Sequence, residues 1–220
     1  MRQTYMDFVY KTLVEIQFGT PIYTNQIAEK VAVLYGLEKT EAAAATAVAI
    51  KRIMDGKVMS ELRCYQKGIY YRTNVTPFGE VGINKEQLIA DKYLLPDIGY
   101  ETGFGVLHRM GLTTQMPRER ILATNVAKDC ARADKKLGIT IRPPKVKITA
   151  DNKMYLQTLD VLDTLENAPI DLEQPYHAIA KHIYEQKLQY RLLLALADHY
   201  YGKNTVLQLA HTANAGGIRI

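Results

Sequence analysis

The segment Gly103–Asn125, GFGVLHRMGLTTQMPRERILATN, contains a helix–turn–strand pattern. It predicts a short helix over Phe104–Met110 that ends at Gly111, because glycine readily adopts the left-handed backbone that often follows a helix. A polar turn comes next, and the run Arg120–Thr124 predicts a strand. Nothing in the segment has the layout of a catalytic site. The pattern therefore indicates a structural or binding role.

The apolar and amide side chains of this segment have predicted structural duties. Leu107 and Leu112 are spaced to bury against the following strand at Ile121 and Ala123. Gln115 lies within the turn, where backbone groups have no partner from a helix or strand. We expect its side chain to satisfy some of these groups.

Residues 1–73 show three helical patterns followed by two strand-like runs. The expected helices cover Met6–Ile16, Thr24–Val33 with Thr24 as N-cap, and Thr40–Asp55, and the expected strands cover Val58–Leu62 and Ile69–Arg72. This order is that of a winged helix-turn-helix. In that domain the third helix enters the major groove, and the hairpin, or wing, contacts the DNA backbone or the minor groove.

Candidate DNA-binding residues follow from that arrangement. They are Lys39, Thr40, Thr46, Lys51, Arg52, Arg63, Lys67 and Arg72. The outward residues of the third helix would read bases, and Arg63 and Lys67 would flank the wing tip. Two structural alternatives stay open. An alanine-rich helix also suits packing in a core or a dimer, and wing tyrosines also suit hairpin packing.

The turn-rich stretch Thr73–Gly82, TNVTPFGEVG, predicts a domain boundary, with a second domain over residues 74–220. A helix or loop is expected over Lys128–Lys136, strands around Pro143–Pro144, and a helical tail from about residue 151 that ends in a frayed segment. The predicted fold class is α+β: an N-terminal winged helix-turn-helix and a mixed α/β C-terminal domain with a helical tail.

Charge is unevenly distributed along the chain. The net charge is +5, with ten Lys/Arg against seven Asp/Glu in residues 1–73, twelve against eight in residues 74–150, and six against eight in residues 151–220. A basic surface attracts phosphate. Five basic residues of the middle part have no apparent apolar role and are expected to form a second phosphate-binding face: Arg118, Arg120, Arg142, Lys145 and Lys147.

The opening segment resembles the C-terminal domain of AbiEi-type antitoxins of type IV toxin–antitoxin systems. In that family a helix ends in a G-L-T-x-Q-x-P turn, and a strand similar to I-A-T-N follows. The matching residues here are Leu107, Gly111, Leu112, Thr113, Thr114, Gln115, Pro117 and Ala123–Asn125. The run Gly68–Tyr71 and the turn Thr76–Glu80 also resemble compact members of the family. The resemblance extends to about residue 150, and the helical C-terminal third departs from it.

This resemblance implies a transcriptional autorepressor that binds inverted repeats in its own promoter as double-stranded DNA. It also implies an antitoxin of an abortive-infection (phage-defence) system, which counters a nucleotidyltransferase-like toxin without forming a stable complex with it. Two alternatives stay open: a stand-alone winged-helix regulator without a toxin, and a protein-interaction module.

Other classes find little support in the composition. No apolar run is long enough for a transmembrane helix, and the start lacks a signal-peptide pattern, so we expect a cytoplasmic protein with no membrane partner. Cys64 and Cys130 lie far apart, and His177 and His182 miss the i,i+4 spacing of a helical zinc site. We therefore predict no enzyme activity, no cofactor and no metal site.

Overall fold

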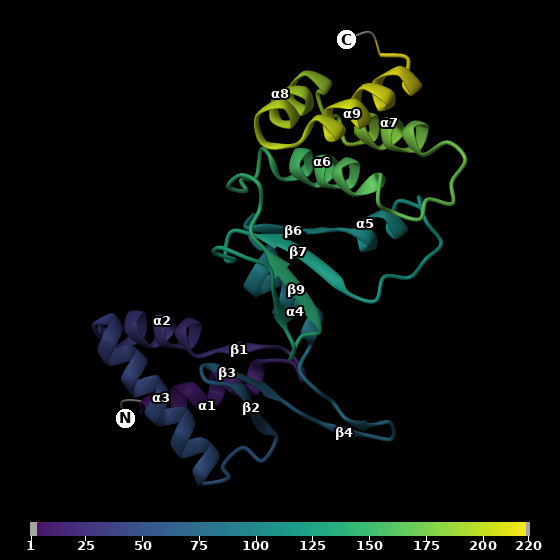
Figure 1. Cartoon of the computed structure of the whole chain (residues 1–220). Helices are drawn as coiled ribbons and strands as arrows, with labels where there is room; N and C mark the ends of the chain where they lie inside the picture. Colours follow the sequence, from purple (N-terminus) through teal and green to yellow (C-terminus); the bar gives the residue numbers. More distant parts are fainter. Residues whose placement is uncertain (1–3, 219–220) are drawn as a thin grey trace. The chain divides into compact units, whose positions relative to one another are not determined.

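The structure is a computed structural model that describes residues 4–218. Its internal contacts divide the chain into two compact units, Met1–Leu88 and Ile89–Ile220 (Figure 1). Both units combine helices with small sheets, as expected of the α+β class. Each unit is described by itself.

The first unit has three long helices, a three-stranded sheet, a small hairpin and most of the short helix α4, which ends one residue beyond the boundary. Its elements are α1 (Tyr5–Glu15), β1 (Ile22–Tyr23), α2 (Thr24–Tyr35), α3 (Lys39–Asp55), β2 (Leu62–Gln66), β3 (Ile69–Arg72), β4 (Val75–Thr76), β5 (Gly79–Glu80) and α4 (Lys85–Ile89). The sheet is antiparallel with the order β1-β3-β2. Helix α3 packs against both α1 and α2. The three predicted helices are therefore confirmed.

Local chemistry explains where the first helices begin and end. A capping box joins Thr4 and Asp7 at the start of α1, and Gly36 ends α2 with a left-handed φ of 65°. Thr24 is not the N-cap that the sequence predicted. It is the first residue of α2, and its hydroxyl donates to the Gly68 carbonyl at 3.2 Å, which ties α2 to the β2–β3 turn.

One predicted strand is displaced. Residues 58–61 are not in a strand, and β2 begins only at Leu62. The chain leaves α3 through a tight turn instead: Lys57 has φ 51°, and the Val58 amide donates to the Ile53 carbonyl at 3.0 Å. This turn uses the residues that the alternation of side chains had assigned to the strand.

The boundary between the units falls after Leu88 rather than after Thr73. The β4–β5 hairpin belongs to the first unit, where the Thr73 hydroxyl donates to the Val81 carbonyl at 2.8 Å and the Asn84 amide donates to the Gly19 carbonyl at 2.7 Å. The turn-rich sequence thus forms a hairpin rather than a linker.

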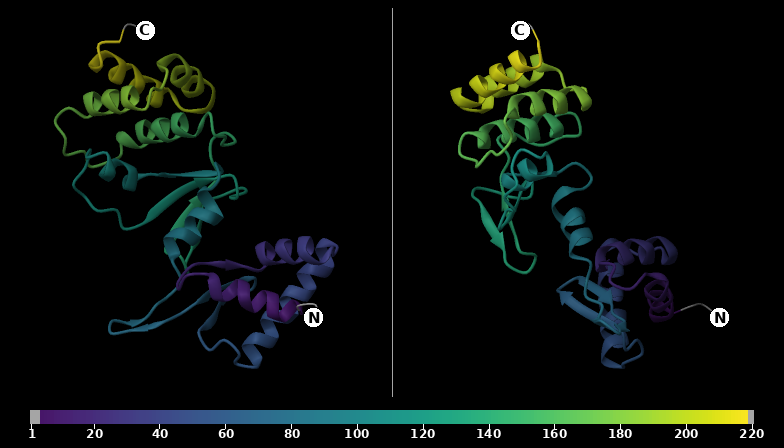
Figure 2. Two further views of the ribbon diagram at one scale, coloured as in Figure 1. Left: turned by 180° about the vertical axis from the view of Figure 1, so that it is seen from behind. Right: turned by 90° about the vertical axis from the view of Figure 1, so that its right-hand side faces the viewer.

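The second unit stacks helices on a four-stranded sheet. Its elements are the π-helix η1 (Ala90–Leu94), β6 (Gly99–Thr102), α5 (Phe104–Arg109), β7 (Arg120–Thr124), β8 (Arg132–Asp134), β9 (Ile139–Arg142), α6 (Lys153–Leu165), α7 (Pro175–Glu185), α8 (Tyr190–Tyr200) and α9 (Lys203–Ala215). The strand order is β6-β7-β9-β8, with β7 and β9 parallel. Helix α6 lies between β6 and the outer helices α8 and α9 (Figures 1 and 2).

The segment Gly103–Asn125 forms the predicted helix, turn and strand as α5 and β7. Gly111 has φ 71°, and Leu107 and Leu112 are completely buried. Their buried cluster, however, is formed by α5 to α9 and includes Leu159 and Ile179, whereas Ala123 belongs to a different cluster. The helical tail is therefore the main partner of this segment.

Gln115 does not hold the turn, because its exposed side chain makes no hydrogen bond with any described residue. Asp171 does so from the loop before α7. Its carboxylate accepts from the Thr114 amide at 2.8 Å and from the Thr114 hydroxyl at 2.7 Å. These two hydrogen bonds hold the pKa of Asp171 below its usual value.

Three further predictions for the second unit differ from the structure in part. The segment Lys128–Lys136 contains the edge strand β8 rather than a helix or loop alone. Strand β9 precedes Pro143–Pro144 as predicted, but none of the described residues between these prolines and α6 forms a strand. The closing segment was predicted to fray, but α9 continues to Ala215 and Ala213 is completely buried. Residues 219–220 lie outside the described part of the chain.

Candidate nucleic-acid interface

Helix α3 presents two different faces. Ala42, Thr46, Ala49, Ile50 and Ile53 are buried against α1 and α2. The opposite face is exposed and includes Thr40, Ala44, Ala47 and Lys51, and Lys39 and Arg52 are exposed beside it. The small side chains of this face allow another surface to come close to the helix.

Thr46 was predicted to read bases, and the structure contradicts this. Its side chain is completely buried, because position 46 follows Ala42 by one turn and precedes Ile50 and Ile53 by one and two turns on the same face. Its hydroxyl oxygen has no hydrogen-bond partner among the described residues. Thr46 is therefore part of the core.

The β2–β3 hairpin places Lys67 at its turn, next to Gly68 with φ 82°. The turn also contacts the start of α2, because the Thr24 amide donates to the Gly68 carbonyl at 3.0 Å. Lys67 is exposed. The turn that carries Lys67 therefore lies at the N-terminal end of α2, where the helix dipole is positive, a combination that suits a phosphate.

Arg63 does not flank that turn. It pairs with Tyr71 in the sheet register, toward the other end of the hairpin. Its guanidinium donates to the Glu80 carboxylate of β5 at 3.0 Å and to the Ser60 carbonyl at 2.7 Å. Arg63 remains partly exposed, but it connects the two hairpins of the first unit.

Arg72 is a structural residue. It is only 8% exposed, and its guanidinium donates to the carbonyls of Val14 and Ile16 at the end of α1 and to the Glu61 carboxylate at 3.1 Å. The guanidinium also lies 4.5 Å from the centre of the Phe18 ring. A buried guanidinium that donates to these protein groups is not available to contact DNA. The prediction that Arg72 binds DNA was therefore wrong.

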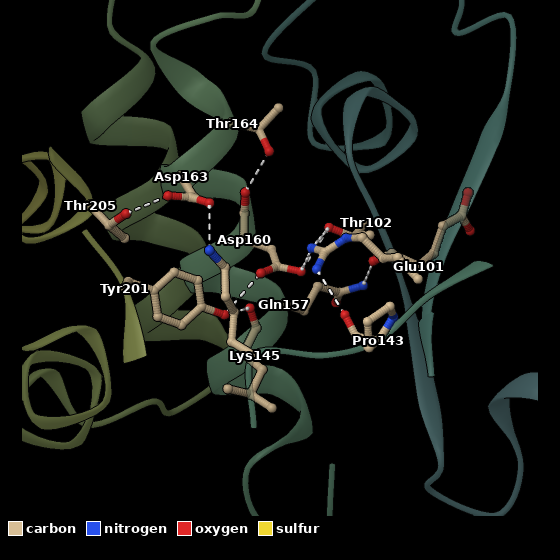
Figure 3. A network of polar contacts seen from close by, with 12 residues as sticks. Glu101, Thr102, Pro143, Lys145, Gln157, Asp160, Asp163, Thr164, Tyr201 and Thr205 are labelled. Carbon is tan, nitrogen blue, oxygen red and sulfur yellow. Dashed lines mark hydrogen bonds and ion pairs between the residues drawn. The ribbon is translucent and has the colours of Figure 1, made fainter. Parts of the chain in front are cut away.

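Two predicted cations of the second unit, Arg142 and Lys145, belong to a network of polar contacts around the buried Asp160 (Figure 3). The guanidinium of Arg142 pairs with the carboxylate of Asp160, which is 1% exposed and also accepts from the hydroxyls of Thr102 and Tyr201 at 2.9 Å each. Lys145 lies 3.7 Å from the Asp163 carboxylate, which accepts from Thr205.

This network joins β9 and β6 to α6 and the start of α9. Burial, followed by the nearby charge of Asp160, raises the pKa of both Tyr100 and Tyr201, so both phenols are neutral at ordinary pH. Arg142 therefore has a structural role, and the carboxylate of Asp163 partly balances the charge of Lys145. Of Arg142, Lys145 and Lys147, only Lys147 is exposed and forms no ion pair within the described part of the chain.

The other two arginines of the predicted second face also differ. Arg118 is exposed, whereas the Nε of Arg120 lies 3.3 Å from the Glu101 carboxylate. Sequence reasoning missed a more accessible group: Lys128, Arg132 and Lys135 are all exposed on or beside the edge strand β8. Their density of positive charge was the available signal, but the segment had been treated as a helix or loop.

The described residues include no group of three histidine, cysteine or acidic side chains that could hold a metal ion. Cys64 and Cys130 are free and exposed. Between residues 4 and 218, none of the helices is both long and apolar enough to cross a membrane.

Comparisons with known proteins identify no relative. No protein-family model, no curated protein and no solved structure matches this chain.

Proposed function

We propose that this protein is a transcription regulator whose first unit is a winged helix-turn-helix that binds double-stranded DNA. One observation carries the proposal: the element order α1-β1-α2-α3-β2-β3, with the sheet order β1-β3-β2, leaves the outer face of α3 exposed. This is the arrangement expected of a helix that enters the major groove beside a wing.

The chemistry of α3 supports that role. Lys51 and Arg52 can approach phosphates or guanine edges, and the methyl groups of Ala44 and Ala47 can approach thymine methyl groups. Lys67, at the β2–β3 turn and beside the start of α2, supplies a separate phosphate contact. Thr40 and Lys39 lie at the N-terminal end of α3, from which helices of this kind read bases.

The second unit contributes a further contact in this proposal. The exposed cations around β8 replace Arg142 and Lys145 as its phosphate-binding residues, together with Lys147. Lysines on an edge strand also protect it from pairing with other strands, so this contact needs its own test. Changing Lys128, Arg132 and Lys135 to glutamine should reduce the affinity of the full chain for all DNA sequences alike and lower its salt dependence.

A titration with DNA tests the main proposal. The full chain is mixed with duplex DNA from upstream of its own gene and with a random duplex, from low to moderate salt. Binding should weaken steeply with salt, because each phosphate contact releases counterions. The upstream sequence should bind tighter than the random one. Absence of binding to both duplexes at low salt would refute the proposal and favour a protein-interaction module.

We further propose that the regulator represses its own operon at inverted repeats and acts as an antitoxin toward a nucleotidyltransferase-like toxin. The support is the resemblance of the Gly103–Asn125 segment to AbiEi-type antitoxins, and the helix–turn–strand of α5 and β7 is compatible with it. Co-expression of this protein with a nucleotidyltransferase encoded beside its gene should restore growth of cells that the toxin alone inhibits. This rescue should occur although the two proteins do not form a stable complex in a pull-down experiment. If the toxin stays lethal while promoter binding persists, the protein is a stand-alone regulator.

A further inference from the structure

A groove of about 500 Å³ lies within the second unit, between α5, α6 and α7. Its apolar lining comes from Val106 on α5, Met110 at the end of that helix, Val161 on α6 and Ala178 on α7. Its charged lining consists of Arg109, Lys181 and Glu185. This size lies within the range of sites for small molecules.

The packing of the helices explains the groove. Helices α6 and α7 both pack against α9, and α5 packs against α6. The small side chain of Ala178 leaves room between α6 and α7. The amide of Gln157, also in the lining, donates to the Glu101 carbonyl of β6 at 2.8 Å (Figure 3), which fixes the side of the groove nearest the sheet.

The charges around the groove favour an anion. The Glu101 carboxylate faces two arginines at once: it lies 2.5 Å from Nη1 of Arg109 and 3.3 Å from Nε of Arg120. Of these two arginines, Arg109 lines the groove, where Arg109 and Lys181 stand against the single carboxylate of Glu185. Arg109 keeps further N–H donors, and its side chain is 53% exposed.

The opposite wall carries a lysine that is only loosely held. The Nζ of Lys181 lies 3.8 Å from Glu185 on the next turn of α7, and both side chains are mostly exposed. Pairs of this kind hold their charges weakly. His182, also in the lining, is half-buried, and this burial lowers its pKa, so its neutral ring can donate or accept one hydrogen bond.

We propose that this groove binds a small organic anion with an apolar body: the carboxylate, sulfonate or phosphate lies between Arg109 and Lys181, and the apolar body lies against Met110, Val161 and Ala178. Such a ligand matches both the excess positive charge and the apolar floor. The proposal concerns the second unit alone and does not rest on DNA binding.

Two fluorescent probes test the charge recognition. The sulfonate 8-anilinonaphthalene-1-sulfonate should bind the full chain saturably at one site, and N-phenyl-1-naphthylamine has the same aromatic body without the charge. Lys181→Gln should weaken sulfonate binding about 3- to 10-fold, as loss of one charge-assisted contact predicts, and leave the neutral probe unchanged. The matched control is Lys203→Gln on α9, which should change neither affinity.

The apolar floor is tested by Ala178→Phe, which fills the groove and should abolish binding of both probes in a protein with an unchanged circular dichroism spectrum. If this variant fails to fold, proton resonances of the unaltered protein replace it. The sulfonate should shift the ring signals of His182 and not those of His199, which lines a different apolar depression beside α8.

Three results would overturn the proposal. These are absence of saturable sulfonate binding, equal sulfonate affinity in Lys181→Gln and the parent protein, and a ring shift at His199 in place of His182.

Discussion

Helix α3 and the region at the end of β9 each carry two cations close together in the sequence, but the surroundings of these cations differ. Lys51 and Arg52 extend from an alanine-rich surface into solvent. Arg142 instead pairs with the almost completely buried Asp160, and Lys145 lies beside Asp163. Removal of Arg142 should therefore cost stability, whereas removal of Lys51 or Arg52 should cost DNA affinity. A cluster of cations in the sequence therefore indicates an interface only where no nearby carboxylate already forms ion pairs with them.

The strongest test of this comparison is Arg142→Ala. The change leaves the buried Asp160 carboxylate without its cation, so the free energy of unfolding should fall by about 3 kcal/mol, below the top of the usual range because Arg142 is 27% exposed. Urea unfolding of the full chain measures it. Lys147→Ala, five residues along, is the control and should change stability little. Equal stability of the two variants would show that Arg142 is a surface cation after all.

The partner of Arg142 can be tested separately. Adding Asp160→Asn to Arg142→Ala removes the uncompensated charge, so the double variant should recover part of the lost stability. No recovery would mean that the loss comes from the other contacts of Arg142, such as its hydrogen bond to the Pro143 carbonyl.

Arg72→Ala should have the next largest effect, about 2 kcal/mol of unfolding free energy, because carbonyls at the end of α1 lose their donor while the partner carboxylate of Glu61 is still 31% exposed. The same urea measurement applies. DNA affinity of the folded fraction should stay close to that of the parent. A stable Arg72→Ala protein with weakened DNA binding would place Arg72 in the interface instead.

These two arginines also show how far sequence can predict this molecule. Helix ends such as Gly36 and Gly111 were predictable because the signal is local: a glycine next to an apolar periodic run. The partners of Arg142 are not local, since Asp160 lies 18 residues away and Thr102 lies 40 residues away. Only the packing of α6 on the sheet brings them together, and no spacing rule contains that information.

The sheet edge and the tail illustrate two further limits. Strand β8 has three residues, too few for an alternating pattern to emerge from its charged neighbours. The closing sequence from residue 213 suggests a frayed end because it contains Gly216 and Gly217 just after α9, yet Ala213, within α9, is completely buried. Pairing with β9 decided the first outcome, and tertiary burial decided the second.

Lys51→Ala combined with Arg52→Ala should weaken binding to the upstream DNA about 10-fold, equivalent to about 1.4 kcal/mol, and leave unfolding unchanged, because both side chains are exposed. Fluorescence anisotropy at fixed salt gives the affinity. The control is Lys11→Ala, which removes one exposed positive charge on α1 and should change DNA affinity little. Unchanged affinity in the double variant would remove α3 from the interface.

The smallest expected effect belongs to Thr46→Val, which tests the rotation of α3. The Thr46 hydroxyl is buried without a hydrogen-bond partner among the described residues, so a methyl group of the same shape should leave stability unchanged or raise it by up to about 1 kcal/mol. DNA affinity should not change, since the position faces Ile50 and Ile53 rather than solvent. Thr40→Val, on the exposed side of the same helix, should instead weaken binding to the preferred sequence more than to random DNA. If Thr46→Val lost affinity at full stability while Thr40→Val did not, the outer face of α3 would have to be the opposite one, and every base-reading assignment on this helix would move with it.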